Sequence, residues 1–167
     1  MKTLIEITPT IEWKNGKVRL IDQTKLPLEE KYIETDDYRV VCDAIYRLAI
    51  RGAPAIGVAG AYACVLAANE IELTELSDFV NRYLQKSDEI GSTRPTAVNL
   101  MWAVKQMKGK AIGFSGNVTD LKIALLDLAQ EIRDDDIDRC HNLGLHGADL
   151  IPNKSNVMTI CNTGGLA

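Results

Sequence analysis

The chain has 167 residues, a net charge of −4, 46% apolar residues and 25% charged residues. This composition is ordinary for a globular protein with a hydrophobic core, and the absence of a Lys/Arg cluster argues against nucleic acid or an anionic membrane surface as a partner. The apolar stretch at residues 53–68 is too short and too rich in Gly and Ala for a membrane span. Without a signal-peptide pattern at its start, we expect a cytoplasmic protein.

The first predicted element is a β-hairpin. Asn15-Gly16 separates two runs of β-forming residues, so residues 11–21 are expected to pair as two strands. Residues 32–34 are a further short strand candidate. Apolar residues then recur at steps of three and four, which predicts a helix over residues 37–50.

Helices dominate the middle of the chain. Pro54 suits the first turn of a helix at residues 54–69, and its many Ala and Gly residues indicate a buried central helix. Two further helices are expected, followed by a long helix that begins at Asn117 or Thr119 and a final short strand. The two helices are expected at residues 77–87 and 97–107. The long helix is expected at residues 117–133, with an interruption near 134–136 and a restart at 137–150. The strand is expected at residues 157–161.

The four cysteines lie far apart and form no CxxC pair, which argues against a zinc site and against a disulfide framework. Cys42 and Cys64 fall on predicted helices among apolar residues, so we expect buried, unreactive thiols. His141 and His146 are five residues apart and do not share a helix face. For these histidines and for the acidic run at residues 134–136 we expect structural or surface roles.

Two bends place an arginine just before a proline-started helix: Arg51-Gly52-Ala53-Pro54 and Arg94-Pro95. A guanidinium donates two parallel hydrogen bonds to a phosphate or carboxylate. A helix N-terminus adds unpaired N–H groups and a favourable dipole. The alternative for each arginine is an ion pair with one of the acidic residues.

Cys161 closes the predicted final strand and precedes Asn162-Thr163-Gly164-Gly165. Open α/β sheets bind ligands at the carboxyl ends of their strands, and a following helix N-terminus lowers a thiol pKa. The alternatives are a packed thiol at a strand end and a glycine pair that serves only a tight turn.

Three segments together carry a family resemblance: residues 50–57 (IRGAPAIG), 92–100 (STRPTAVNL) and 159–167 (TICNTGGLA). With the supporting stretches at residues 11–13 (IEW), 20–27 (LIDQTKLP) and 146–148 (HGA), they resemble the methylthioribose-1-phosphate isomerases. That family is related to the α, β and δ subunits of translation initiation factor 2B.

The resemblance implies a mixed α and β fold in three parts. Residues 1–117 would form a mostly helical N-terminal domain with a β-hairpin, and residues 118–152 would form connecting helices. Residues 153–167 would be the start of a truncated Rossmann-like α/β domain. A homodimer and a reaction without metal or organic cofactor are also implied.

The implied reaction interconverts 5-methylthioribose 1-phosphate and 5-methylthioribulose 1-phosphate in methionine salvage. By motif, Arg51, Gly52, Ala53 and Arg94 would contact this small phosphorylated sugar, and Cys161 would be the catalytic thiol. The family's catalytic Asp belongs to the C-terminal domain and has no counterpart in these residues, so we expect the chain alone to be inactive.

One residue departs from the family pattern, because Ile160 stands where His is common, and an apolar neighbour raises a thiol pKa. A relative acting on ribose 1,5-bisphosphate is a same-class alternative. The different-class alternative is a regulatory subunit like those of the translation factor, against which the Cys161-Asn162 pair favours an enzyme.

Overall fold

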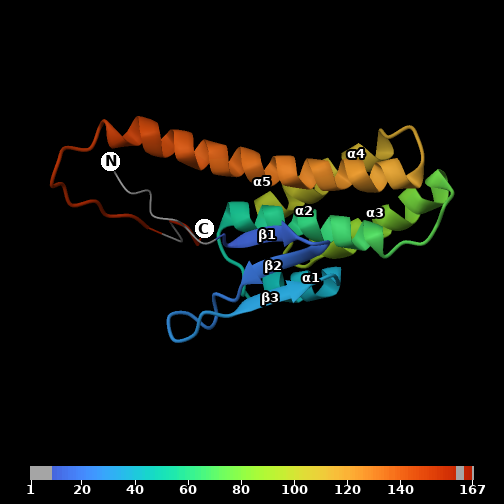
Figure 1. The fold of residues 1–167 in the computed structure, drawn as a ribbon, viewed down its shortest axis with the longest axis horizontal. Coiled ribbons are helices and arrows are strands. Elements are labelled where there is room, and N and C mark those ends of the chain that lie inside the picture. Colours follow the sequence, from blue (N-terminus) through green and yellow to red (C-terminus); the bar gives the residue numbers. More distant parts are fainter. Residues whose placement is uncertain (1–8, 161–163, 167) are drawn as a thin grey trace.

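A computed structural model describes residues 9–160 and 164–166. In this part of the chain a three-stranded antiparallel sheet lies beside a group of helices (Figure 1). The strands are β1 (Ile11–Lys14), β2 (Lys17–Ile21) and β3 (Tyr32–Thr35), in that spatial order. The helices are α1 (Tyr38–Tyr46), α2 (Ala53–Asn69), α3 (Leu76–Ser92), α4 (Val98–Ile112) and α5 (Val118–Ala148). The expected mixed, mostly helical fold is confirmed.

The predicted hairpin is present as β1 and β2. Asn15 and Gly16 have φ angles of 51° and 79°, and a type I′ turn needs positive φ at both central residues. β3 pairs antiparallel with β2, which confirms the predicted third strand. Because side chains alternate along a strand, Val18 and Leu20 share one face, and both are fully buried.

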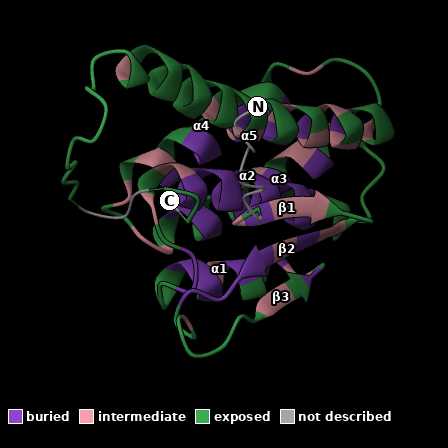
Figure 2. Cartoon of the chain, turned by 60° about the vertical axis from the view of Figure 1, so that its left-hand side comes forward, coloured by how far each residue is buried: buried purple, intermediate pink, exposed green. Residues whose placement is uncertain are grey.

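The centre of the helical layer is α2. All of its residues from Ala55 to Ala68 are buried (Figure 2), and it contacts the four other helices and the sheet. Its small residues permit close approach: a Cβ atom on Gly57 would lie 3.1 Å from the backbone oxygen of Asn99 in α4. The predicted buried central helix is therefore confirmed. In the described part of the chain, no helix is long and apolar enough to cross a membrane.

Helix α1 stops at Tyr46 rather than at residue 50, so the predicted boundary was wrong. Leu48 adopts a left-handed φ of 62°, and the N–H of Ala49 turns back to donate to the carbonyl of Ala44 at 2.8 Å. A left-handed residue just after a helix terminates it in this way. The chain then turns toward Arg51 and α2.

The long final helix is continuous, which corrects the predicted interruption near residues 134–136. Asp134 and Asp135 are exposed and pair with Arg133 and Arg139, the second pair at helical i,i+4 spacing. Water and these partners satisfy the carboxylates without breaking the helix. Its start follows Asn117, whose side chain accepts a hydrogen bond from the N–H of Asp120 at 2.9 Å.

The strand predicted at residues 157–161 is not formed over residues 157–160, which are exposed and lack regular structure. A strand needs a neighbour that pairs its backbone groups, and the described sheet contains only β1, β2 and β3. Cys161 lies outside the described residues. Downstream, residues 164–166 lie close to the start of β1 and to the loop after β2.

Candidate functional site

The first predicted ligand bend is built around Gly52, immediately before α2. Its φ of 87° and ψ of 131° are a conformation that side-chain-bearing residues rarely adopt. Arg51 is exposed, and its Nε donates to the carbonyl of Leu48 at 3.2 Å. Ala53, the first residue of α2, is also exposed. A helix N-terminus that is open to solvent and follows an exposed arginine favours anions.

The second bend is a turn that leads into α4. The N–H of Ala97 donates to the carbonyl of Arg94 at 2.9 Å, and α4 begins at the next residue, Val98. The Arg94 side chain is half-buried. The arginine precedes a helix N-terminus as predicted, but the prediction that Pro95 starts this helix was wrong, because Pro95 lies in the turn and α4 begins three residues later.

The two bends lie at the same end of the helical layer. Gly57 is in the second turn of α2 and touches Asn99, the second residue of α4. A cavity of about 290 Å³ opens there, lined by both helix starts and by the middle of α5. The guanidiniums of Arg51 and Arg94 are not among its lining residues, so the structure brings together the bends rather than the two side chains.

The Gly164–Gly165 turn reaches the same region from the far end of the chain. The carbonyl of Leu166 accepts a hydrogen bond from Nε2 of Gln23 at 2.8 Å. The backbone N–H of Gln23 donates to the carbonyl of Ala49 at 2.9 Å. One residue thus connects the glycine turn to the segment that enters the Arg51 bend.

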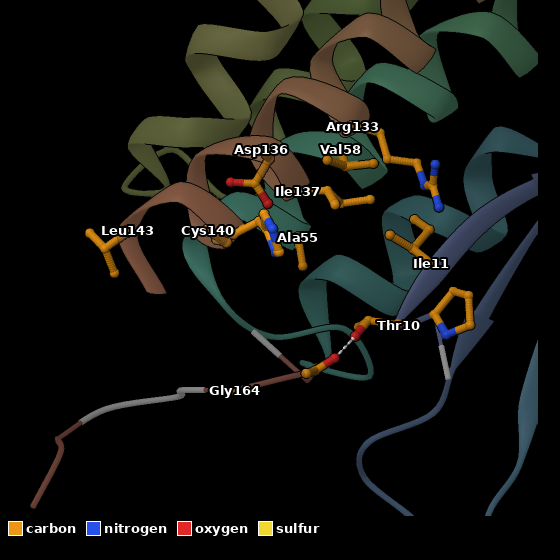
Figure 3. A pocket seen from close by; sticks show the side chains of 13 residues that line it. Thr10, Ile11, Ala55, Val58, Arg133, Asp136, Ile137, Cys140, Leu143 and Gly164 are labelled. Carbon is orange, nitrogen blue, oxygen red and sulfur yellow. Dashed lines mark hydrogen bonds between the residues drawn. The ribbon is translucent and has the colours of Figure 1, made fainter. Parts of the chain in front are cut away.

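A second, larger cavity of about 640 Å³ lies between α2, α5 and the glycine turn (Figure 3). Ala55 and Val58 contribute from α2, and Asp136 and Cys140 contribute from α5. Most of its lining is apolar, and its polar side chains lie on α5 and at Thr10, just before β1. Such a cavity suits a small molecule that has one apolar end and one polar end.

Asp136 faces this cavity, which sequence reasoning missed by assigning the acidic run to solvent. Burial, followed by the nearby charge of Asp135, raises the pKa of Asp136, against the lowering effect of Arg139. The signal was the helical spacing of residues 133, 136, 137 and 140, which share one face of a continuous helix. The predicted break in α5 concealed it.

The other cysteines differ in exposure. Cys64 is fully buried, and burial raises the pKa of its thiol to about 12, so it is unreactive as predicted. Cys42 is only half-buried, so the prediction of a buried thiol was wrong for this residue, although burial still raises its pKa. Cys140 is exposed. Within residues 9–160 and 164–166, His, Cys, Asp and Glu side chains do not gather in groups of three or more able to hold a metal ion.

These features define a group of helices packed beside a small antiparallel sheet, with the start of α2 close to the start of α4 and to the Gly164–Gly165 turn. Residues 49–167 match the model of the initiation factor 2 subunit family, and the chain belongs to this family.

Relatives with curated names point to one branch of it. The chain is 45% identical over 159 residues to the methylthioribose-1-phosphate isomerase of Trichlorobacter lovleyi, covering 95% of this chain and 46% of that protein. It is 44% identical over 160 residues to the isomerase of Synechocystis sp., with 94% and 46% covered. The chain therefore spans about half the length of these relatives.

Two solved structures share the fold. The 5-methylthioribose 1-phosphate isomerase of Pyrococcus horikoshii OT3 superposes with a TM-score of 0.90 at 31% identity, over 96% of this chain and 45% of that one. The translation initiation factor eIF-2B subunit delta from A. fulgidus gives 0.85 at 37% identity, over 95% and 46%. The resemblance found in the sequence is confirmed at the level of the family.

Proposed function

We propose that this chain forms the N-terminal half of an aldose–ketose isomerase that interconverts 5-methylthioribose 1-phosphate and 5-methylthioribulose 1-phosphate. The observation that carries the proposal is the meeting of the α2 start and the Gly164–Gly165 turn at one cavity. Identity of about 45% to named isomerases, over nearly the whole chain, supports it.

The chemistry of the substrate explains what the site must supply. The phosphate on C1 keeps the sugar closed, so the bond between C1 and the ring oxygen must break while the phosphate stays attached. Hydrogen moves from C2 to C1, the ring oxygen gains a proton and the C2 hydroxyl loses one. The reaction therefore needs a clamp for the phosphoryl group and an acid and a base at the sugar oxygens.

We assign the clamp to the two arginine bends. Arg51 and Arg94 supply the positive charge, and the backbone at Gly52 and Ala53 lets the phosphate approach the α2 N-terminus without a Cβ in the way. The apolar cavity wall of Ile11 and Val58 suits the methylthio group. Cys161 is proposed as the acid/base thiol, with its partner carboxylate in the second half of the protein.

The proposal includes a Rossmann-like second domain that follows residue 152, after the helical region 1–117 and the connection 118–152. Exposed apolar side chains on both sides of residue 152 support this second domain, since large exposed apolar patches mark contact surfaces. Leu143, Leu150 and Met158 are 77%, 83% and 96% exposed. The homodimer implied by the resemblance stays a prediction, and analytical ultracentrifugation tests it. The cytoplasmic location also stays a prediction.

A regulatory role is the second candidate, since the eIF-2B subunit delta from A. fulgidus is the more identical of the two solved structures. Such a subunit needs neither a phosphate clamp nor a thiol at residue 161. Binding of a sugar phosphate at the arginine bends therefore separates the two functions.

The test joins residues 1–167 to the second half of the Trichlorobacter lovleyi relative. We expect this fusion protein to convert methylthioribose 1-phosphate, and the chain alone to bind it without turnover. Ribose 1,5-bisphosphate serves as the competing substrate. A folded fusion protein that binds neither sugar would contradict the enzymatic proposal and favour the regulatory one.

A further inference from the structure

The stretch at residues 20–27 supports the family resemblance, and its residue Gln23 connects two segments of the site without a role in the proposed chemistry. In the structure it forms the end of β2 and the loop that follows. Two of its residues, Asp22 and Gln23, are polar and yet only 4% and 9% exposed. Buried polar groups are kept where they satisfy specific hydrogen bonds, so their partners indicate what the loop does.

Gln23 has a partner on either side. Its side-chain Nε2 donates to the carbonyl of Leu166 at 2.8 Å, across 143 residues of sequence. Its backbone N–H donates to the carbonyl of Ala49 at 2.9 Å, two residues before Arg51. Gln23 is therefore hydrogen-bonded to both of the segments that the proposed reaction must hold together.

A neighbouring contact fixes the same turn. The hydroxyl of Thr10 donates to the carbonyl of Gly165, the residue before Leu166 (Figure 3). Thr10 and Gln23 flank the hairpin at its open end, where the N–H of Ile21 donates to the carbonyl of Thr10 at 3.1 Å. Two successive carbonyls of the glycine turn thus accept hydrogen bonds from Thr10 and Gln23, which lie on either side of this Ile21–Thr10 bond.

Asp22 makes the loop rigid. Its Oδ1 accepts from the backbone N–H and the hydroxyl of Thr24 at 3.1 and 2.6 Å, and its Oδ2 accepts from Nη1 of Arg47 at 3.1 Å. The N–H of Asp22 donates to the carbonyl of Lys31 at 2.7 Å. Because every one of these bonds is local to the loop or to the end of α1, Gln23 is presented in a fixed position.

We propose that Gln23 is a positioning residue that sets the position of the Gly164–Gly165 turn relative to the phosphate-binding Arg51 bend. The inference rests on the proposed function for its chemical meaning, since the thiol must reach the sugar while the bend holds the phosphate. A misplacement of about 1 Å in such a pair reduces catalysis by roughly 100-fold.

The test replaces the donor without changing the shape. Gln23→Glu removes the Nε2–H group and places a carboxylate against the Leu166 carbonyl. Gln85→Glu is the matched control, because Gln85 lies on the exposed surface of α3 and contacts Arg82. Backbone ¹⁵N order parameters are measured for Gly164, Gly165 and Leu166 in the 167-residue chain.

In the wild-type chain and in Gln85→Glu, we expect order parameters in the rigid range near about 0.85, and in Gln23→Glu a fall below about 0.6 confined to the glycine turn. Unchanged values in Gln23→Glu overturn the proposal. A loss of order that also spreads through α2 overturns it too, because the residue would then have a merely structural role.

A ligand arm separates this inference from the proposed function. Gln23→Glu should weaken methylthioribose 1-phosphate binding at least about threefold and leave inorganic phosphate binding unchanged, since only the sugar contacts the turn. Equal weakening of both ligands contradicts a positioning role. If the wild-type chain binds neither ligand, the proposed function fails, and the order parameters alone decide whether Gln23 holds the turn.

Discussion

Asp22 and Arg47 form an ion pair of 3.1 Å that ties the loop after β2 to the end of α1. The Asp22 side chain is 6% exposed and that of Arg47 is 35% exposed. Burial alone would raise the pKa of Asp22, but hydrogen bonds from Thr24 and Arg47 outweigh it and lower the pKa below its usual range. The ionised carboxylate is therefore part of the folded state.

Asp22→Asn should reduce the free energy of unfolding by about 1–2 kcal/mol at neutral pH, the scale of a charged hydrogen bond with one partly exposed partner. Because the folded pKa is lowered, this contribution is present above the unfolded value of about 3.9. It disappears as the pH falls through the folded pKa. Urea denaturation of both proteins from pH 2 to pH 7 measures the difference.

Asp43→Asn is the control for this pair. Asp43 also bonds Arg47, at 2.8 Å, but its side chain is 62% exposed. Exposed pairs of this kind contribute about 0.5 kcal/mol or less. An equal loss in both variants would show that the buried position of Asp22 has no special weight.

Gly57→Ala should destabilise the protein although alanine is the better helix former. The new Cβ would lie 3.1 Å from the backbone oxygen of Asn99, and a backbone atom cannot move aside as a flexible side chain does. We expect the free energy of unfolding to fall by about 1–2 kcal/mol, within the range for overfilled cores.

Gly109→Ala in α4 is the control, since no heavy atom lies within 4 Å of the position that its Cβ would take. There the helix gain of up to about 1 kcal/mol should appear, and stabilisation at both sites would contradict the close α2–α4 contact.

The local elements were predictable because short-range chemistry decides them. Asn15-Gly16 specifies its hairpin turn, and Pro54 with the small residues after it specifies a buried helix. The end of α1 was missed because it depends on a left-handed Leu48, a residue type that gives no such signal. The continuity of α5 was missed because the acidic run resembles a loop, and the cavity-facing position of Asp136 was lost with it.

Long-range contacts were the least predictable part of the site. The sequence indicated that Arg51 and Arg94 each lie in a bend before a helix. That both bends lie at one end of the fold depends on how α2 packs against α4. The link from Gln23 to Leu166 joins positions 143 residues apart, and no local pattern encodes such a pair. The strand predicted at residues 157–161 is absent over residues 157–160. Its apolar pattern predicted a strand, but a strand also needs a neighbouring strand to pair with.

Replacement of the bend arginines should weaken sugar-phosphate binding without unfolding the chain. Arg51→Ala and Arg94→Ala are each expected to raise the Kd for methylthioribose 1-phosphate by tenfold or more, because each removes a charged hydrogen-bond donor to the phosphate. Arg82→Ala, on the exposed face of α3, should leave the Kd unchanged. Isothermal titration calorimetry measures the Kd of all three variants. An unchanged Kd in Arg51→Ala would contradict phosphate binding at this bend.

Cys161→Ser should lower kcat of the fusion protein at least about 100-fold, the range attributed to a positioned acid or base, while KM changes little. A serine hydroxyl keeps the size of the group but does not ionise near neutral pH. Cys42→Ser is the matched control, since this half-buried thiol lies in α1. Full activity of Cys161→Ser would assign the proton transfer to another group.

The central claim is that the Arg51 bend and the Gly164–Gly165 turn belong to one sugar-phosphate site. Titration of the ¹⁵N-labelled chain with methylthioribose 1-phosphate tests it directly. We predict that the amide signals of Gly52, Ala53, Gly164 and Gly165 shift together and fit one common Kd. Shifts at only one of the two segments, or separate Kd values for them, would contradict the account.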